Sequence, residues 1–170
     1  MPESVAYFFN GEPMAGKAET YMGTMVADSH VLKFVGPNAY PFLPADGLDK
    51  ASFGGAAKNL IGSFPDLTFN FEKATPKRNK DGSWSADIVV MGTHTGAAFS
   101  PMPDKLPAIE TTNKCVKIGP ETFTLWVDAE GKVIKTEITP GATDGTPHPH
   151  GPPGFYAEIG GVLPGPRAAP

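Results

Sequence analysis

The chain has 170 residues, a formal net charge of −4 and a hydrophobic fraction of 40%. This length is typical of one domain with a real core, and the acidic balance gives no support to a nucleic-acid or anionic-membrane partner. The single cysteine, Cys115, excludes an intramolecular disulfide and a cysteine-based zinc site. No apolar run approaches the roughly 20 residues that span a bilayer, and Met1–Lys17 lacks a signal peptide's apolar region. We therefore expect a cytoplasmic protein with no membrane partner.

The N-terminal part of the chain predicts helical segments followed by a strand. Val5–Asn10 is short and apolar, and it fits either one or two helical turns or a strand. Apolar residues recur at helical spacing in Gly16–Ala27, which predicts a helix. His30–Val35 then alternates from face to face, which predicts a strand. The Pro-rich and aromatic loop at 36–46 should lay Tyr40 or Phe42 over the core.

The segment Asp49–Glu72 should organise the rest of the core. Six apolar residues fall at i, i+3, i+4, i+7, i+8 and i+11 and form one helical stripe. They are Phe53, Ala56, Ala57, Leu60, Ile61 and Phe64. Pro65 should end this helix, because the residue before a proline is pushed out of the helical region. Apolar and polar residues then alternate, which predicts a strand over Leu67–Ala74.

The second half of the chain predicts antiparallel strands joined by hairpins. A hairpin signal at Asn79–Gly82 precedes a long strand over Ser83–Thr95. Alternation resumes over Ile109–Ile118, and Gly119-Pro120 is interpreted as a turn. A final hairpin should join Glu121–Asp128 to Lys132–Thr139.

The C-terminal part of the chain is dense in glycine and proline. From Pro140 to Pro170 this density argues against long regular structure. Phe155, Tyr156 and other apolar residues of the segment remain available to pack on the body or on a partner. We therefore divide the chain into a domain over residues 1–140 and a Gly/Pro-rich tail over residues 141–170.

Helices followed by a strand, a helix and antiparallel strands predict an α+β domain. Four segments in this order resemble motifs of the SnoaL-like proteins, a polyketide cyclase family of the NTF2-like superfamily. Ala27–Val31 resembles the "ADDV" that ends the family's second helix, and Phe64–Asp66 resembles its "FPD". Gly92–Gly96 reads as its "GTHTG", and Asp128–Val133 resembles its "xxDGKI" turn. Together the four are fairly specific for a fold, which by itself does not determine function.

The resemblance implies a curved antiparallel sheet, wrapped into a cone by the N-terminal helices, with a ligand cavity inside. Family members include polyketide cyclases, isomerases and dehydratases as well as proteins that only bind ligands or dimerise. Two departures stand out. The first helix is short, so the cavity should be more open or be covered by the C-terminal tail. The catalytic Asp that SnoaL-type cyclases carry on the last strand is missing from Ile134–Gly141.

Three residues are the candidates for catalysis. His94 follows a strand that should line the cavity, and a histidine near its ordinary pKa can shuttle a proton. Glu137 is the only carboxylate on the last strand, although the alternation turns it, with Lys135, away from the apolar face. Asp66 can pair with His94 or with His30 as a proton-transfer dyad. The alternative for each is a structural role: a hydrogen-bonded histidine, a solvated glutamate and a turn acceptor.

Four residues are the candidates for ligand binding. Tyr21 and Tyr40 can donate hydrogen bonds to a ligand carbonyl, and each can equally belong to the core or to a lid. His30 shares a face with Leu32 and Phe34 and should point inward at the cavity mouth. Trp126, on the strand before the last turn, is the fourth candidate.

No metal or cofactor motif accompanies these residues. His148 and His150 are too few ligands for a closed zinc site, and the sequence contains no P-loop, GxGxxG, GxSxG or HExxH. The resulting hypothesis is a cofactor-free, metal-free SnoaL-like domain, dimeric through the outer face of its sheet, that holds a small apolar carbonyl compound. Whether it catalyses proton transfer (isomerisation, cyclisation or dehydration) or is a non-catalytic binding or interaction domain stays open.

Overall fold

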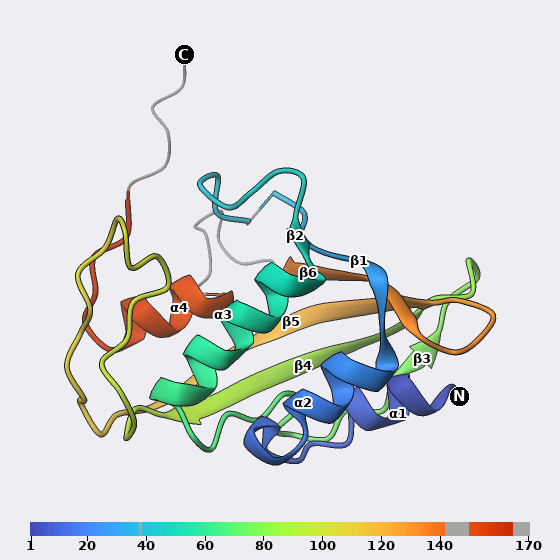
Figure 1. Ribbon diagram of the computed structural model, residues 1–170, viewed down its shortest axis with the longest axis horizontal. Helices are drawn as coiled ribbons and strands as arrows, with labels where there is room; N and C mark the ends of the chain where they lie inside the picture. Colours follow the sequence, from blue (N-terminus) through green and yellow to red (C-terminus); the bar gives the residue numbers. More distant parts are fainter. Residues whose placement is uncertain (38, 142–149, 165–170) are drawn as a thin grey trace.

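The computed structural model describes residues 1–37, 39–141 and 150–164. Figure 1 shows a curved, unclosed sheet with helices lying across it, which confirms the predicted α+β class and cone-like architecture. The six strands are β1 Val26–Phe34, β2 Leu48–Asp49, β3 Lys77–Arg78, β4 Trp84–Thr93, β5 Cys115–Val127 and β6 Val133–Pro140. Their order in the sheet is β2-β1-β6-β5-β4-β3. Only β1 and β6 pair in parallel; the other neighbours are antiparallel.

Helices cover the concave side of this sheet. The α-helices are α1 Glu3–Phe8, α2 Ala18–Thr20, α3 Lys50–Ser63 and α4 Gly151–Glu158. A 3-10 turn at Met14–Gly16 and a π-helical turn at Tyr21–Met25 flank α2. In Figure 1, α3 crosses in front of β4 and β5, and α4 lies beside the end of α3.

The predicted helix after Leu48 is confirmed as α3. Its first turn is capped by the Asp49 side chain, which accepts a hydrogen bond from the Ser52 N–H at 2.8 Å. The helix ends where Phe64 leaves the helical conformation, one residue before Pro65. Within the apolar stripe Leu60 is buried, whereas Phe53 is only partly buried. The stripe therefore leaves part of its surface facing a space between helix and sheet.

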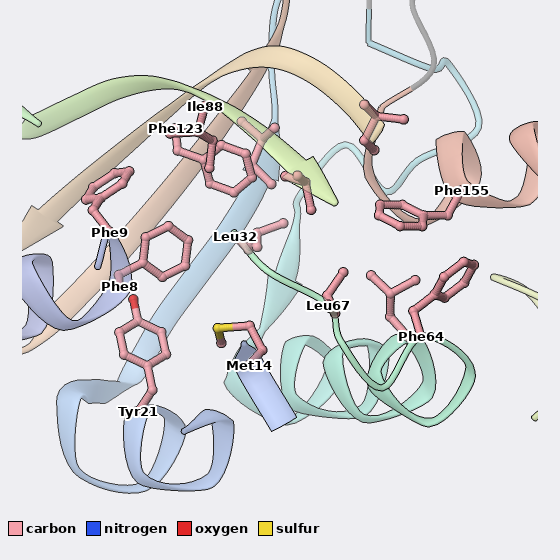
Figure 2. Packing of buried hydrophobic residues seen from close by; sticks show 14 of the residues in the cluster. Phe8, Phe9, Met14, Tyr21, Leu32, Phe64, Leu67, Ile88, Phe123 and Phe155 are labelled. Atoms are coloured by element: carbon pink, nitrogen blue, oxygen red, sulfur yellow. The ribbon is translucent and has the colours of Figure 1, made fainter. Parts of the chain in front are cut away.

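Aromatic residues hold the helices to the sheet. Phe8 of α1 contacts Phe123 of β5 with ring centroids 5.7 Å apart, and Phe64 contacts Phe155 of α4 at 4.8 Å. Figure 2 shows these residues gathered over the inner face of the strands. Each such side chain, when fully buried, contributes roughly 1.5–3 kcal/mol, so the two pairs anchor opposite ends of the helical layer.

The prediction of a helix over Gly16–Ala27 is wrong at its C-terminal end. After α2 the chain makes the π-helical turn Tyr21–Met25, and β1 begins at Val26. The pairing of β1 with β6 shifts register between Val26 and Val31, which accommodates Asp28 and Ser29 in a bulge. The helical part of the prediction is confirmed over residues 18–25, where α2 continues directly into the π-helical turn and Tyr21 is buried.

The predicted strand over Leu67–Ala74 is also wrong. Asn70 and Lys73 have φ of 54° and 57°, a left-handed conformation that is incompatible with regular strand geometry. The Asn70 side chain bonds the Phe9 carbonyl at 2.7 Å and the Ala74 backbone at both its N–H and its carbonyl. These side-chain bonds replace a regular strand ladder. Backbone contact with β4 is limited to the bridge from Thr68 to Met91 and a bond from the Phe71 N–H to the Val89 carbonyl at 2.9 Å.

The interpretation of Gly119-Pro120 as a turn is wrong. β5 runs from Cys115 to Val127, and Gly119 and Pro120 form a bulge within it, where two residues of β5 oppose the single residue Val89 of β4. The predicted strand over Ile109–Ile118 therefore shrinks to its last residues. The final hairpin from β5 to β6 is confirmed.

The C-terminal segment contains a helix that its composition conceals. α4 starts with prolines in its first turn, where a missing N–H costs nothing. Phe155 and Tyr156 are 1% exposed, so they pack on the body, whereas Val162 is 82% exposed. The segment thus adds a wall to the helical layer.

Candidate functional site

A cavity of about 750 Å³ lies between the helical layer and the inner face of the sheet. Its wall is mostly apolar and comes from α3, α4, the strands β1 and β4–β6, and the loops around residues 42–44 and 101–105. Polar side chains in the wall are few: Ser52, Asn59, Asp104, Lys105, Glu121 and Thr136. Such a wall suits a mostly apolar ligand that a small number of polar groups orient. Pro152, Pro153 and Phe155 of α4 belong to this wall, so the C-terminal segment covers part of the cavity.

Glu121 is the buried carboxyl group of this cavity. It lies on β5 opposite Ile88 and Pro140 and is 2% exposed. Its Oε1 accepts a hydrogen bond from the Gly151 N–H at 3.1 Å, and its Oε2 has no hydrogen-bond partner among the described residues. Burial raises its pKa to about 7, against a smaller lowering by the Gly151 bond. Glu121 is therefore poised between acid and base near neutral pH.

Tyr40 and His150 form a stacked aromatic pair close to Glu121. The two rings stack with centroids 4.1 Å apart, and the Tyr40 N–H donates to His150 Nε2 at 3.4 Å. The pKa of Tyr40 is raised by burial and then by the nearby Glu121 charge. Tyr40 thus lies within electrostatic reach of Glu121, although it is not one of the lining residues.

His30 and Thr136 form a second polar pair. His30 is 1% exposed, stacks on Phe53 at 5.4 Å and places its Nε2 3.0 Å from Thr136 Oγ1. Burial and then the Lys50 charge lower its pKa to about 4, so the imidazole is neutral at pH 7. Thr136 lines the cavity and His30 stands behind it.

His94 does not line the cavity. It is fully buried, stacked on Phe64 at 5.0 Å, with Nδ1 3.1 Å from Thr112 Oγ1 and Nε2 3.1 Å from the Ala97 carbonyl. These contacts hold the segment after β4 in place. His94 therefore has the structural role that was the alternative to catalysis.

Asp66 pairs with neither His30 nor His94 in the described structure. Its two carboxylate oxygens accept from the Thr93 N–H at 2.6 Å and from the Thr93 hydroxyl at 2.7 Å. Both predicted dyads are therefore absent among the described residues, because Asp66 fastens the end of α3 to β4 instead.

Glu137 and Trp126 lie on the outer face of the sheet. Glu137 forms an ion pair with Lys135, whose Nζ sits 4.2 Å from the Trp126 ring centre. The alternation correctly turned Glu137 away from the apolar face. Tyr21 is 1% exposed and packs against Phe8 at 5.4 Å, so it belongs to the core. Of the predicted residues, only His30 and Tyr40 come close to the cavity's polar groups.

Sequence reasoning missed Glu121, although a signal existed. Glu121, Phe123 and Leu125 share one face of β5, and both Phe123 and Leu125 are buried. A carboxylate that shares a strand face with buried apolar residues is expected to lie inside the core as a titratable group. Because Gly119-Pro120 was interpreted as a turn, Glu121 was placed at the end of a strand, and its position on the same face as Phe123 and Leu125 was overlooked.

Within the described residues no group of three or more His, Cys, Asp or Glu side chains gathers as a metal site. His148, one of the two histidines considered for a metal, lies outside the described residues. No helix of the described chain is long and apolar enough to cross a membrane.

Comparison with solved structures identifies the architecture. IdmH, a candidate polyketide cyclase from Streptomyces antibioticus, is 16% identical, with a TM-score of 0.55 over 80% of this chain and 88% of its own. A candidate SnoaL-like polyketide cyclase from Jannaschia sp. CCS1 is 11% identical, with a TM-score of 0.52 over 80% and 81%. The chain has the SnoaL-like, NTF2-like fold. RV0760c from Mycobacterium tuberculosis, solved with estradiol-17β-hemisuccinate, has the same fold at 12% identity, with a TM-score of 0.53 over 79% and 88%. No family model and no curated protein sequence matches the chain.

Proposed function

We propose that this SnoaL-like chain binds a small, largely apolar carbonyl compound in its cone and moves a proton on it without a cofactor. The observation that carries the proposal is Glu121, whose carboxyl group lies in the wall of an apolar cavity with one oxygen that no described residue bonds. A buried carboxyl group of this kind loses most of its hydration, which makes its ionised form a stronger base than a carboxylate in water. The solved structure of RV0760c with a steroid derivative is consistent with a ligand of this size in the fold.

The proposed step is a proton transfer at carbon. Ionised Glu121 takes a proton from the carbon next to the ligand's carbonyl, and the electron pair of that C–H bond forms the double bond of an enolate. Protonated Glu121 then returns the proton to the same carbon or to a conjugated carbon, which regenerates the base. With a pKa near 7, both forms of the carboxyl group are populated at neutral pH.

Exchange of the acidic protons of 2-tetralone in D₂O, followed by NMR, tests this step. We expect the protein to accelerate exchange, with a rate that rises as pH increases through about 7. Glu121→Gln keeps the shape of the side chain and should lower the protein-dependent rate about 100-fold or more. Glu137→Gln, the matched change on the outer face, should leave the rate unaltered. Equal rates for the Glu121→Gln variant and the unmodified protein would refute the proposal.

A second candidate is a non-catalytic carrier for the same class of ligand. It is favoured by the neutral state of His30 at pH 7, because a neutral ring cannot protonate the ligand as an imidazolium would. A carrier would bind 2-tetralone and show no acceleration of exchange at any pH. Such a result would retain the ligand class and reject the catalytic step.

We also propose that two copies associate through the outer face of the sheet. The Lys135, Trp126 and Glu137 cluster on that face carries both a ring and a pair of opposite charges, which suits a self-complementary contact. Native mass spectrometry should give a dimer mass, and Trp126→Glu should convert it to the monomer. A monomer for the unmodified chain would refute this part.

A further inference from the structure

The cavity has polar groups at two separated places along the strands. Thr136 of β6 pairs with Leu125 of β5, whereas Glu121 pairs with Pro140. The register between these pairs is unbroken, so Glu121 and Thr136 lie four residues apart along the strands, about 13 Å. Both side chains line the cavity, and the apolar pair Phe123 and Ile138 lies between them.

His30 determines which way the Thr136 hydroxyl group can donate. The ring is buried and neutral, so one ring nitrogen carries a hydrogen and the other does not. Nδ1 has no partner among the described residues, and Nε2 is 3.0 Å from Thr136 Oγ1. A buried N–H without an acceptor is costlier and rarer than an unpaired acceptor nitrogen. The hydrogen therefore belongs on Nε2, where it is donated to Thr136 Oγ1. That oxygen then acts as acceptor toward His30, which leaves its own hydrogen to donate elsewhere.

We infer that Thr136 donates a hydrogen bond to an oxygen acceptor at the far end of the bound molecule, with His30 as its positioning residue. The inference rests on the proposed function, since it concerns the same cavity and ligand. It adds that the ligand carries an oxygen function at each end. The offset of the two residues along the strands makes the distance between these two functions on the order of 10 Å.

The apolar side chains of Phe123 and Ile138, between Glu121 and Thr136, should make the cavity selective for the distance between the ligand's two oxygen functions. On the sheet side of the cavity, a ligand whose second oxygen lay between these two places would put that oxygen against Phe123 or Ile138, whose side chains have no polar atom. A ligand without the second oxygen would leave the Thr136 hydroxyl group unpaired. Sites that hydrogen-bond a polar substituent discriminate against analogues that cannot use the bond.

Two matched naphthols test the inference by calorimetric or fluorescence titration at pH 8, where Glu121 is ionised. In 6-acetyl-2-naphthol a phenol and a carbonyl oxygen stand at opposite ends of a rigid two-ring frame. The phenol suits Glu121 and the carbonyl suits Thr136. In 6-ethyl-2-naphthol the carbonyl is missing. We expect the unmodified protein to prefer the acetyl compound, and Thr136→Val to reduce that preference about 10-fold.

Variants separate the hydroxyl group from the shape of the side chain. Thr136→Ser retains the hydroxyl group and should retain the preference, which controls for folding. His30→Leu should lower the preference as Thr136→Val does without changing the affinity for 6-ethyl-2-naphthol. His30→Gln, whose amide N–H can replace Nε2–H, should restore part of it. A merely structural His30 would instead weaken binding of both compounds equally.

The outcomes distinguish this inference from the function on which it rests. If both naphthols bind and Thr136→Val leaves their ratio unchanged, the second polar contact is refuted and the cavity function stands. If neither naphthol binds, the proposed ligand class fails, and the inference fails with it. If Glu121→Gln abolishes binding of both while Thr136→Val alters only their ratio, both conclusions are supported.

Discussion

Glu121 and Glu137 belong to neighbouring strands of one sheet and meet opposite surroundings. Glu121 faces the cavity, is 2% exposed and, within the part of the chain that the structure describes, accepts one hydrogen bond, from the Gly151 N–H. Glu137 faces outward and is paired with Lys135, in a group whose side chains remain 24–39% exposed. The same side chain is thus a titratable group near pH 7 on one face and one partner of a solvated ion pair on the other. The pleat of the strand makes this difference.

The largest contrast should appear when aromatic residues of the two faces are truncated. Phe123 on the inner face contacts Phe8 and Phe69, each with ring centroids 5.7 Å away. Phe123→Ala should lower the free energy of unfolding by about 3–5 kcal/mol. Trp126→Ala on the outer face should cost about 1 kcal/mol or less, because the residue is not fully buried and lies outside the core cluster. Urea titration of both variants checks this, and equal losses would show that the outer face is buried by a partner.

The next contrast compares the two glutamates directly at pH 8. Glu121 must ionise inside the fold against a pKa raised from 4.5 to about 7, which costs about 3 kcal/mol above pH 7. Glu121→Gln removes this cost, so it should raise the free energy of unfolding by up to about 3 kcal/mol. Glu137→Gln should change it by less than about 1 kcal/mol. Chemical denaturation at pH 8 and pH 4 tests both, and the gain for Glu121→Gln should vanish at pH 4.

A pH series should expose a compensation between Glu121 and His30. The folded state holds the Glu121 proton more tightly than the unfolded chain does, so this group lowers stability as pH rises from 4.5 to about 7. The folded state holds the His30 proton less tightly, so this group raises stability as pH rises from about 4 to 6.5. The unmodified protein should be nearly flat across pH 4.5–6.5. Glu121→Gln should instead gain stability steadily over that window, and a flat profile would contradict the assignment to His30.

The smallest effect should come from the outer face. Lys135→Met retains most of the stem over Trp126 and removes the charge that pairs with Glu137. An ion pair this exposed is worth about 0–1 kcal/mol and is screened by salt. The midpoint of thermal unfolding should therefore move by a few degrees at most, and less in high salt. A larger shift would indicate that the outer face is desolvated.

The elements predicted well from sequence are those with long, regular patterns. The α3 stripe and the final hairpin follow from periods of 3.6 and 2, and the four family-like motifs pointed to the cone. The π-helical turn at Tyr21–Met25 and the side-chain bonds of Asn70 were not predicted, because no hydrophobic period in the sequence indicates them. α4 escaped because prolines break helices everywhere except in the first turn.

The candidate site was harder to predict than the fold, because its polar residues come from distant parts of the chain. His94 was chosen for its place in a motif, yet Thr112 and Ala97 occupy both of its ring nitrogens. Glu121 was passed over, and its hydrogen-bond donor Gly151 comes 30 residues later. His30 was correctly placed on the inner face of its strand, but its contact with Thr136 spans 106 residues. Contacts of this length follow from how the strands pair, which local patterns do not contain.

The position of α4 has a consequence for biosynthesis. Every other wall of the cavity comes from residues before 139, while Gly151, Pro152, Pro153 and Phe155 are added last. On the ribosome, the sheet and α3 can therefore assemble with their apolar inner surface still open at one end. Translation must continue past α4 before that surface is covered and Glu121 receives its hydrogen bond from Gly151. A stalled nascent chain of this protein should thus be a target for chaperones until its final helix emerges.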